Sequence, residues 1–320
     1  MRLIDNLAAA LKPPTARPPR YAILSHTWGE DELSFGEAQP GFLRATPSSP
    51  RPGWDKVVMA RKMALDHGYD FLWVDTCCID KTNSTELSEA INSMFKWYAE
   101  AEVCYVYLCD VPDDDDIRHR HSQFRRSRWF DRGWTLQELL ASREVHFYSK
   151  GWKFLGTKAE LSDAIEDITG IPSDVLVGGD CRVPARSIAE VFSWASRRET
   201  TLEEDLAYSL LGLLDINMTL IYGEGSRAFI RVQEELLRTY EDESIFAWEA
   251  PPNEALSQPT SGLLSPTLAY FEASHRFLKP RIWTRLDTNP VTITSQGIGV
   301  DLQLLSDDSA SGQWLALLNC

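Results

Sequence analysis

One stretch of the sequence mixes more reactive side chains than a simple surface helix needs. It reads S-R-W-F-D-R-G-W-T-L-Q-E-L-L and spans residues 127–140. On a helix over 134–141 the apolar residues, among them Trp134 and Leu136, fall on one side, and Glu138 points elsewhere. Periodicity alone therefore favours a solvent-exposed acid. The alternative is a working carboxylate, and the elements around Glu138 must decide between the two.

A basic segment leads into this acid. Residues 118–132 hold six arginines and follow the acidic run 113–116 almost directly. Opposite charges so close in sequence can pair with one another in a solvated loop. In the alternative interpretation Arg132 faces a ligand, because a guanidinium group binds phosphate or carboxylate through two parallel hydrogen bonds.

The alternation of strands and helices indicates the fold. Apolar runs predict strands at 21–28, 71–78, 103–111 and 145–149, and helical periodicity predicts helices at 54–68, 83–101 and 134–141. Gly68 is a stop signal for the first helix, and Asn83 with Glu86 is a start signal for the second. Strands and helices in this order are typical of an α/β fold with a parallel sheet flanked by helices.

Polar side chains gather where the predicted strands end. The first two strands are followed or ended by Ser25, His26, Trp28, Asp75, Cys78 and Asp80. In open parallel sheets ligands bind beyond the carboxyl ends of the strands. Glu138 begins its helix after the third strand, so we expect it at the same edge of the sheet.

The rest of the chain divides by composition. We predict a Pro-rich lead-in at 1–20, an α/β core at 21–156, a helical part at 157–248, a linker at 249–270 and a β-rich, apparently incomplete element at 271–320. In the helical part, Thr201 with Glu204 predicts a capping box. Y-G-E-G-S-R at 222–227 predicts the turn before a helix rather than a phosphate loop, because no strand precedes it and it has no lysine.

Composition and charge exclude several classes of partner. The net charge of −15 argues against non-specific binding to nucleic acid or to an anionic membrane. No signal-peptide pattern and no apolar run of spanning length is visible, so we expect a cytoplasmic protein. The six cysteines include no C-x-x-C pair, and we predict reduced thiols and no metal site.

Several motifs together resemble the fungal heterokaryon-incompatibility (HET) domain. They include Y-A-I-L-S-H-T-W-G-E at 21–30, F-L-W-V-D-T-C-C-I-D-K at 71–81, the 127–140 stretch and I-Y-G-E-G-S-R-A-F-I-R-V-Q-E-E at 221–235. The resemblance runs in order from about residue 21 to 248. HET domains trigger cell death after non-self recognition between fungal strains. The resemblance thus implies an incompatibility partner protein and, as in the similar TIR domains, self-association on activation.

HET domains are in turn similar to TIR domains, many of which cleave NAD at the nicotinamide–ribose bond. Ser127, Trp129 and Glu138 are placed like the Ser, Trp and Glu of the TIR pattern, although their spacing is longer. This resemblance implies a TIR-like parallel sheet, Glu138 as the catalytic carboxylate and NAD or a related nucleotide as substrate, with no further cofactor.

The same resemblance assigns the polar edge of the sheet to the nucleotide. Trp28 and Trp134 would stack a ring, and Ser25 and Arg132 would donate to the pyrophosphate. Asp75 and Asp80 would hold hydroxyl groups or basic side chains. His26 and Cys78 complete the predicted nucleotide-binding residues.

Two alternatives to an NAD glycohydrolase stay open at this point. A non-enzymatic module that kills by self-association or by recruiting a partner needs none of these polar residues for chemistry. A cysteine hydrolase would pair Cys78 with His26, since both lie at strand ends. Cysteine is also common as a small buried apolar residue, which argues against the second alternative.

Overall fold

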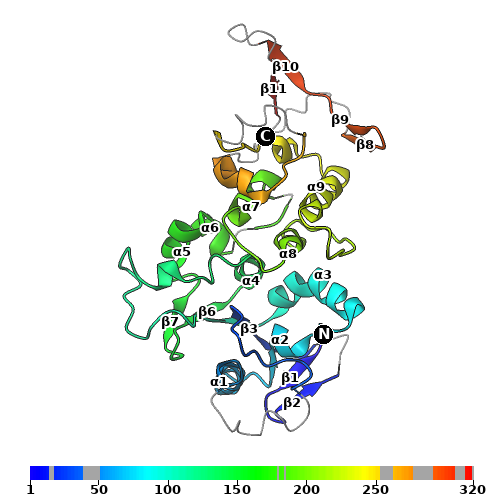
Figure 1. Cartoon of the computed structure of the whole chain (residues 1–320). Coiled ribbons are helices and arrows are strands. Elements are labelled where there is room, and N and C mark those ends of the chain that lie inside the picture. The colour runs from blue at the N-terminus through cyan, green and yellow to red at the C-terminus, as the bar shows by residue number, and fades with distance from the viewer. Residues whose placement is uncertain are drawn as a thin grey trace. The chain divides into compact units, whose positions relative to one another are not determined.

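A computed structural model describes residues 1–13, 18–38, 51–178, 180–183, 185–252, 262–276, 291–306 and 314–318 (Figure 1). The chain forms two compact units, Met1–Gly179 and Asp180–Cys320. Each unit is described separately below. The domain limits predicted from composition stay predictions.

The first unit is built on a mixed sheet with a parallel centre. Its strands are β1 (Leu3–Asp5), β2 (Ala10–Lys12), β3 (Ala22–His26), β4 (Phe71–Trp73), β5 (Val103–Tyr107), β6 (Val145–Tyr148) and β7 (Phe154–Thr157). They lie in the order β2-β1-β4-β3-β5-β6-β7. The pairs β4–β3, β3–β5 and β5–β6 are parallel, and the flanking pairs are antiparallel. The predicted α/β class with a parallel sheet is confirmed for these central strands.

The antiparallel edge strands are additions that the sequence analysis missed. Strands β1 and β2 are three residues each and lie inside the predicted Pro-rich lead-in. Ile4 of β1 pairs with Leu72 of β4 and is fully buried, so the start of the chain is part of the sheet. Runs of three residues are too short to show a strand periodicity, and this is why pattern reading overlooked them.

Helices flank the sheet of the first unit (Figure 1). They are α1 (Pro52–Asp66), α2 (Asp75–Cys78), α3 (Ser84–Glu100), α4 (Thr135–Ala141), α5 (Ser162–Thr169) and α6 (Ser173–Leu176). Gly68 follows α1 with a φ of +81°, and the Asn83 side chain accepts hydrogen bonds from the backbone at Thr85 and Glu86, so the predicted stop and start are confirmed.

One predicted strand is too long. Residues 75–78 do not continue β4 but form the single turn α2. The backbone N–H of Val74 donates to the Cys78 sulfur, and the N–H of Cys78 donates to the Val74 carbonyl, which closes this turn. Asp75 and Cys78 therefore begin and end a helical turn rather than continue a strand.

The second unit contains helices and two β-hairpins. Its elements are α7 (Ile188–Ala195), α8 (Glu203–Tyr208), α9 (Arg227–Thr239), the 3₁₀ turns η3 (Glu243–Phe246) and η4 (Leu268–Arg276), and the strands β8 (Thr292–Thr294), β9 (Gly297–Gly299), β10 (Gln303–Ser306) and β11 (Trp314–Leu317). The pairs β8–β9 and β10–β11 confirm the predicted β-rich character of the described part of 271–320. Phe192 of α7 packs against Phe271 of η4, with ring centres 4.9 Å apart.

The predicted capping box of α8 is wrong. Residue 202 is the N-cap, and no side chain caps the helix there. The Glu204 carboxylate instead accepts hydrogen bonds from the backbone N–H groups of Gly223 and Gly225, at 2.7 and 2.9 Å. Both glycines have positive φ, and the turn they form precedes α9, as the Y-G-E-G prediction required.

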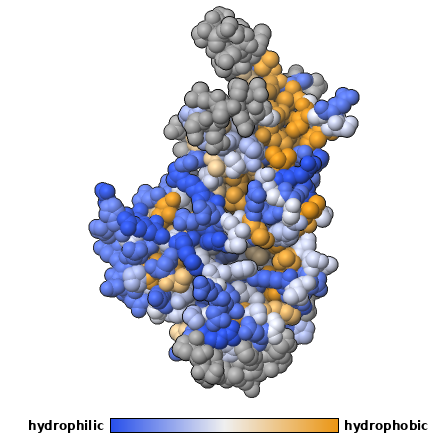
Figure 2. All heavy atoms as spheres, in the orientation of Figure 1, coloured by the Kyte–Doolittle hydropathy of each residue, from blue (hydrophilic) through white to orange (hydrophobic). Residues whose placement is uncertain are grey.

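On the face drawn in Figure 2, the surface of the sheet-containing unit is mainly hydrophilic, in agreement with the charged composition of the chain. Among the described residues, no helix combines the length and the apolar character that a bilayer crossing requires.

Candidate functional site at the carboxyl ends of the central strands

Glu138 is buried on α4. Only 7% of the residue is exposed, so the solvent-exposed acid that periodicity favoured is wrong. Helix α4 is short, and it contacts α3, α6 and β3 of the same unit. Because these neighbours cover it on more than one side, even its polar residues Gln137 and Glu138 are buried. A single apolar stripe predicts that the polar residues of a helix are exposed only when no other element packs on the opposite face of that helix.

Glu138 belongs to a chain of hydrogen bonds that starts at a tryptophan. The indole N–H of Trp129 donates to Ser25 Oγ at 2.8 Å, and Ser25 Oγ–H donates to the Glu138 carboxylate. Ser25 lies near the carboxyl end of β3, so Glu138 is at the predicted edge of the sheet. We call Ser25, Trp129 and Glu138 the glutamate cluster.

Two groups near Glu138, the Tyr98 phenol and the Cys104 thiol, are neutral. Burial raises the pKa of the Tyr98 phenol, and the charge of Glu138 raises it further. The pKa of the Cys104 thiol is raised by the same two causes in the same order. Both groups therefore stay protonated at physiological pH beside Glu138, and Cys104 is no thiolate nucleophile.

Both ends of α4 are fixed, and with them the position of Glu138. At the start of the helix, Thr135 Oγ1 donates to the carbonyl oxygens of Trp129 and Arg132, at 2.5 and 2.9 Å. At its end, the buried ammonium group of Lys158 donates to the carbonyl oxygens of Leu139 and Ser142, at 3.0 and 2.6 Å. A cation at the C-terminus of a helix satisfies carbonyl groups that have no partner within the helix.

A second group of polar side chains lies around His26, the last residue of β3. His26 Nε2 is 3.6 Å from Glu32 Oε2 and 3.8 Å from Asp75 Oδ1. Neither ring nitrogen of His26 has a hydrogen-bond partner among the described residues, although both are buried. Lys56 Nζ lies 2.6 and 2.8 Å from the two Glu32 oxygens. We call His26, Glu32, Lys56 and Asp75 the histidine cluster.

Charge holds the histidine cluster together. Burial alone would raise the pKa of Glu32, but His26 and Lys56 outweigh it and lower this pKa to about 2. Burial lowers the pKa of Lys56, and Glu32 opposes that shift. Glu32 is ionised at neutral pH and pairs with Lys56. Sequence reasoning missed Glu32 and Lys56. Glu32 lies beyond the end of β3, and Lys56 is on α1, which is distant from β3 in sequence.

Trp28 offers an exposed ring at this edge. Trp28 is 51% exposed, and its indole N–H donates to Asp75 Oδ2 at 2.7 Å. Lys81 Nζ lies 3.4 Å from the centre of the ring and 3.9 Å from Asp75 Oδ2. The ring is thus oriented by Asp75 and covered by a cation, an arrangement that suits a cation–π contact. Lys81 was not predicted as a site residue, although it ends the 71–81 motif.

From the basic segment, Arg128 is held at the sheet edge. Arg128 Nε donates to Thr27 Oγ1 at 3.1 Å, and its Nη2 donates to the Trp28 carbonyl oxygen at 2.9 Å. The backbone N–H of Arg128 donates to Asp110 at 2.9 Å. Arg132 and Trp134 are partly buried next to the start of α4. Their predicted roles in nucleotide binding stay predictions.

Two predicted site residues face away from this group. Asp80 accepts hydrogen bonds from the backbone N–H and the hydroxyl group of Thr82, and so shapes the turn before α3. Cys78 lines a cavity beside α3. Since neither nitrogen of His26 is hydrogen-bonded among the described residues, the Cys78–His26 pair of a cysteine hydrolase is not formed. In the part of the chain that the structure describes, no three His, Cys, Asp or Glu side chains are grouped to hold a metal ion.

Two comparisons with known proteins match this part of the chain. A model of the family described as heterokaryon incompatibility protein (HET) matches residues 21–122, which contain Ser25 and the whole histidine cluster. The chain is also 44% identical over 248 residues to vegetative incompatibility protein HET-E-1 of Podospora anserina. The chain is a HET-domain protein. The match to HET-E-1 covers 74% of this chain and 18% of that relative.

A second family model matches a later segment of the chain. A model described as a domain of unknown function (DUF8212) matches residues 227–272. No solved structure matches the chain. Glu138 lies beyond the residues that the HET family model matches, and its hydrogen bond to Ser25 connects it with that segment.

Proposed function

We propose that this protein is an effector of fungal non-self recognition and programmed cell death, and that it acts by hydrolysing NAD at the nicotinamide–ribose bond. The observation that carries the enzymatic part is the position of Glu138. Its carboxylate accepts a hydrogen bond from Ser25 at the carboxyl end of a central parallel strand. Ligands bind at this edge in open α/β sheets.

The chemistry suits one carboxylate. When the bond between nicotinamide and ribose C1′ breaks, the bonding electrons leave with the pyridinium ring, which departs as neutral nicotinamide. The ribose becomes an oxocarbenium-like cation, and a nearby carboxylate stabilises it. Water then adds to C1′ and loses a proton to the carboxylate or to solvent, giving ADP-ribose. No general acid is required for the leaving group, so Glu138 can perform the reaction without a second carboxylate.

The other residues would bind the substrate. Trp28 presents an exposed ring for stacking, and Asp75 fixes its orientation. The ammonium group of Lys81 beside this ring provides a positive charge for the pyrophosphate. Ser25, predicted as a pyrophosphate donor, donates to Glu138 instead and would hold the carboxylate in place.

Activation must expose the carboxylate. Glu138 is 7% exposed, so a substrate reaches it only after neighbouring side chains move. Self-association on activation, or binding of an incompatibility partner protein, would drive that movement. An isolated chain at low concentration is then expected to turn over NAD slowly.

A non-enzymatic death-signalling module is the second candidate function. The burial of Glu138 and its bond to Ser25 favour it, since a buried polar group with partners can serve the fold alone. In that case the protein would kill by assembling or by recruiting a partner.

NAD turnover separates the two functions. The full chain is incubated with NAD at high protein concentration or after forced dimerisation, and released nicotinamide is measured. Glu138→Gln keeps the shape of the side chain and is expected to lower turnover by a factor of about 100 or more. Glu144→Gln is the control, because Glu144 has an exposed side chain in the same unit.

Cell killing gives an independent outcome. Expression of wild type, Glu138→Gln and Glu144→Gln in a fungal host is compared, with thermal melting of each purified protein to verify folding. If folded Glu138→Gln kills as well as wild type, the enzymatic proposal fails and the non-enzymatic module is retained.

A further inference from the structure

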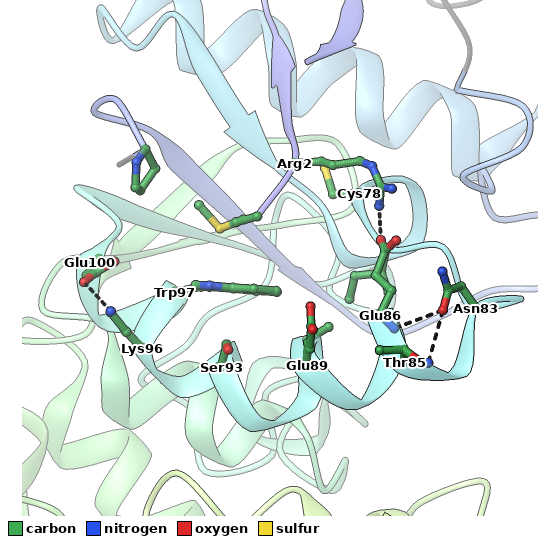
Figure 3. Close-up of a pocket in the computed structure, with 14 residues that line it drawn as sticks. Arg2, Cys78, Asn83, Thr85, Glu86, Glu89, Ser93, Lys96, Trp97 and Glu100 are labelled. Atoms are coloured by element: carbon green, nitrogen blue, oxygen red, sulfur yellow. Dashed lines mark hydrogen bonds and ion pairs between the residues drawn. The ribbon is translucent and has the colours of Figure 1, made fainter. Parts of the chain in front are cut away.

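A cavity of about 480 Å³ lies beside α3 (Figure 3), and Glu138 is not among the residues that line it. One wall is the face of α3 that carries Glu86, Glu89, Ser93 and Trp97, and the opposite wall includes Arg2 from the start of the chain. This volume lies within the range of about 300–1,000 Å³ that is typical of small-molecule sites. We call it the α3 cavity.

Most charges around the α3 cavity are already paired. The Arg2 guanidinium group donates to Glu86, and it also stacks on the Phe35 ring at 4.7 Å. Lys96 Nζ lies 3.7 Å from a Glu100 oxygen. Both cationic side chains of the lining therefore have carboxylate partners. A free anion would have to compete with those carboxylates, so the lining does not favour an anionic ligand.

Glu89 differs from the other charged groups of the lining. It has neither an ion pair nor a hydrogen bond with any described residue, and it projects into the cavity from the middle of α3 (Figure 3). The charged side chains of the lining are three glutamates, one arginine and one lysine, so Glu89 is the carboxylate left over after the two pairs are formed. Its charge favours a cationic ligand.

Trp97 adds a flat apolar wall. It lies two helical turns after Glu89 on the same face of α3, with Ser93 between them (Figure 3). The ring of Trp97 packs on Trp73 with ring centres 5.7 Å apart, which holds it in place. A carboxylate and an indole ring on one face of a helix suit a ligand that is both positively charged and flat.

We propose that the α3 cavity binds a small organic cation in which an amidinium or ammonium group is attached to a flat apolar group. The cationic group pairs with Glu89, the flat group packs against Trp97, and Ser93 supplies a hydroxyl group between them. This site shares no residue with the glutamate or histidine clusters, so it stands independently of NAD hydrolysis.

The test measures binding of benzamidine, a flat amidinium compound, to the full chain by calorimetry or ligand-observed NMR at low salt. Benzamide has the same shape without the charge and is expected to bind at least about tenfold more weakly. Glu89→Gln should weaken benzamidine binding by about tenfold or more, because it removes the lining carboxylate that has no partner among the described residues. Ser93→Phe should abolish binding by filling the cavity.

Asp66→Asn is the matched control, since Asp66 is an exposed acid at the end of α1 that does not line the cavity. It should bind benzamidine as wild type does. The proposal is overturned if wild type shows no binding at concentrations up to about 10 mM, a range that detects even weak small-molecule sites. It is also overturned if benzamide binds as well as benzamidine, or if Glu89→Gln and Asp66→Asn bind equally.

Discussion

The glutamate and histidine clusters differ from the α3 cavity in how their polar groups are satisfied. In the two clusters, carboxylates are held by named donors: Ser25 for the buried Glu138, and the buried Lys56 for the partly buried Glu32. In the α3 cavity, Glu89 is exposed and has no partner among the described residues. Both regions lie in the same unit, and α2 separates them: Asp75 begins this turn in the histidine cluster, and Cys78 ends it at the cavity.

Because of this difference, substitutions in the clusters should affect the free energy of unfolding, and substitutions of Glu89 should affect ligand binding. Removing one partner of a buried pair leaves a desolvated charge, so substitutions in the clusters should unfold the protein more easily. Removing an exposed, unpaired carboxylate should leave the free energy of unfolding almost unchanged and affect only a ligand. The predictions below test this contrast, beginning with the largest effect.

Lys56→Met should destabilise the first unit most. Lys56 is 6% exposed, and its ammonium group lies within 2.8 Å of both Glu32 oxygens. Losing it leaves Glu32 without its cation, at a cost of about 3–5 kcal/mol in the free energy of unfolding. Urea denaturation measures this loss. The double variant Lys56→Met with Glu32→Gln should recover part of the lost stability. If the single and double variants are equally destabilised, the ion pair between Lys56 and Glu32 does not explain the loss.

Trp129→Phe should have the next largest effect. Trp129 is 1% exposed, and its indole N–H donates to Ser25. Removal of a buried hydrogen-bond partner should cost about 1–3 kcal/mol in the free energy of unfolding. Trp28→Phe is the comparison, because its indole N–H also reaches an oxygen but the residue is half exposed. Denaturation midpoints that rank Trp28→Phe as the more harmful change would show that burial is not the deciding factor.

Acid should weaken the histidine cluster through Glu32. The pKa of Glu32 is lowered from 4.5 to about 2 in the folded protein. Its contribution to stability is therefore complete above pH 4.5 and is lost as the pH falls towards 2. The thermal midpoint of wild type should fall across this interval more steeply than that of Glu32→Gln. Parallel pH profiles of the two proteins would exclude Glu32 as a source of acid sensitivity.

The central fold could be predicted because its strands are continuous apolar runs. The strands that became β3, β4, β5 and β6, and the helices between them, follow from periodicity and from Gly68 and Asn83 as boundary signals. The edge strands could not be predicted in this way. β1 and β2 become strands through pairing with β4 and with each other, and that pairing is a property of the folded sheet.

The candidate site could be predicted in position but not in detail. The edge of the sheet and the place of Ser25 and His26 follow from the strand ends. The burial of Glu138 does not, because it depends on elements that cover α4 from several sides. Lys56 reaches the site from α1, a helix whose sequence shows only an amphipathic pattern. Partners so distant in sequence become visible only when the chain is folded.

Glu89→Gln should change stability least. Because Glu89 is exposed and unpaired among the described residues, its replacement should alter the free energy of unfolding by less than about 0.5 kcal/mol. Glu86→Gln is the comparison on the same helix, since Glu86 accepts from Arg2 and from the backbone N–H of Asp80 and should be the more costly substitution. Urea denaturation of both variants ranks them. A larger loss for Glu89→Gln would mean that its carboxylate supports the fold, and the α3 cavity would then lack the spare charge that a cationic ligand needs.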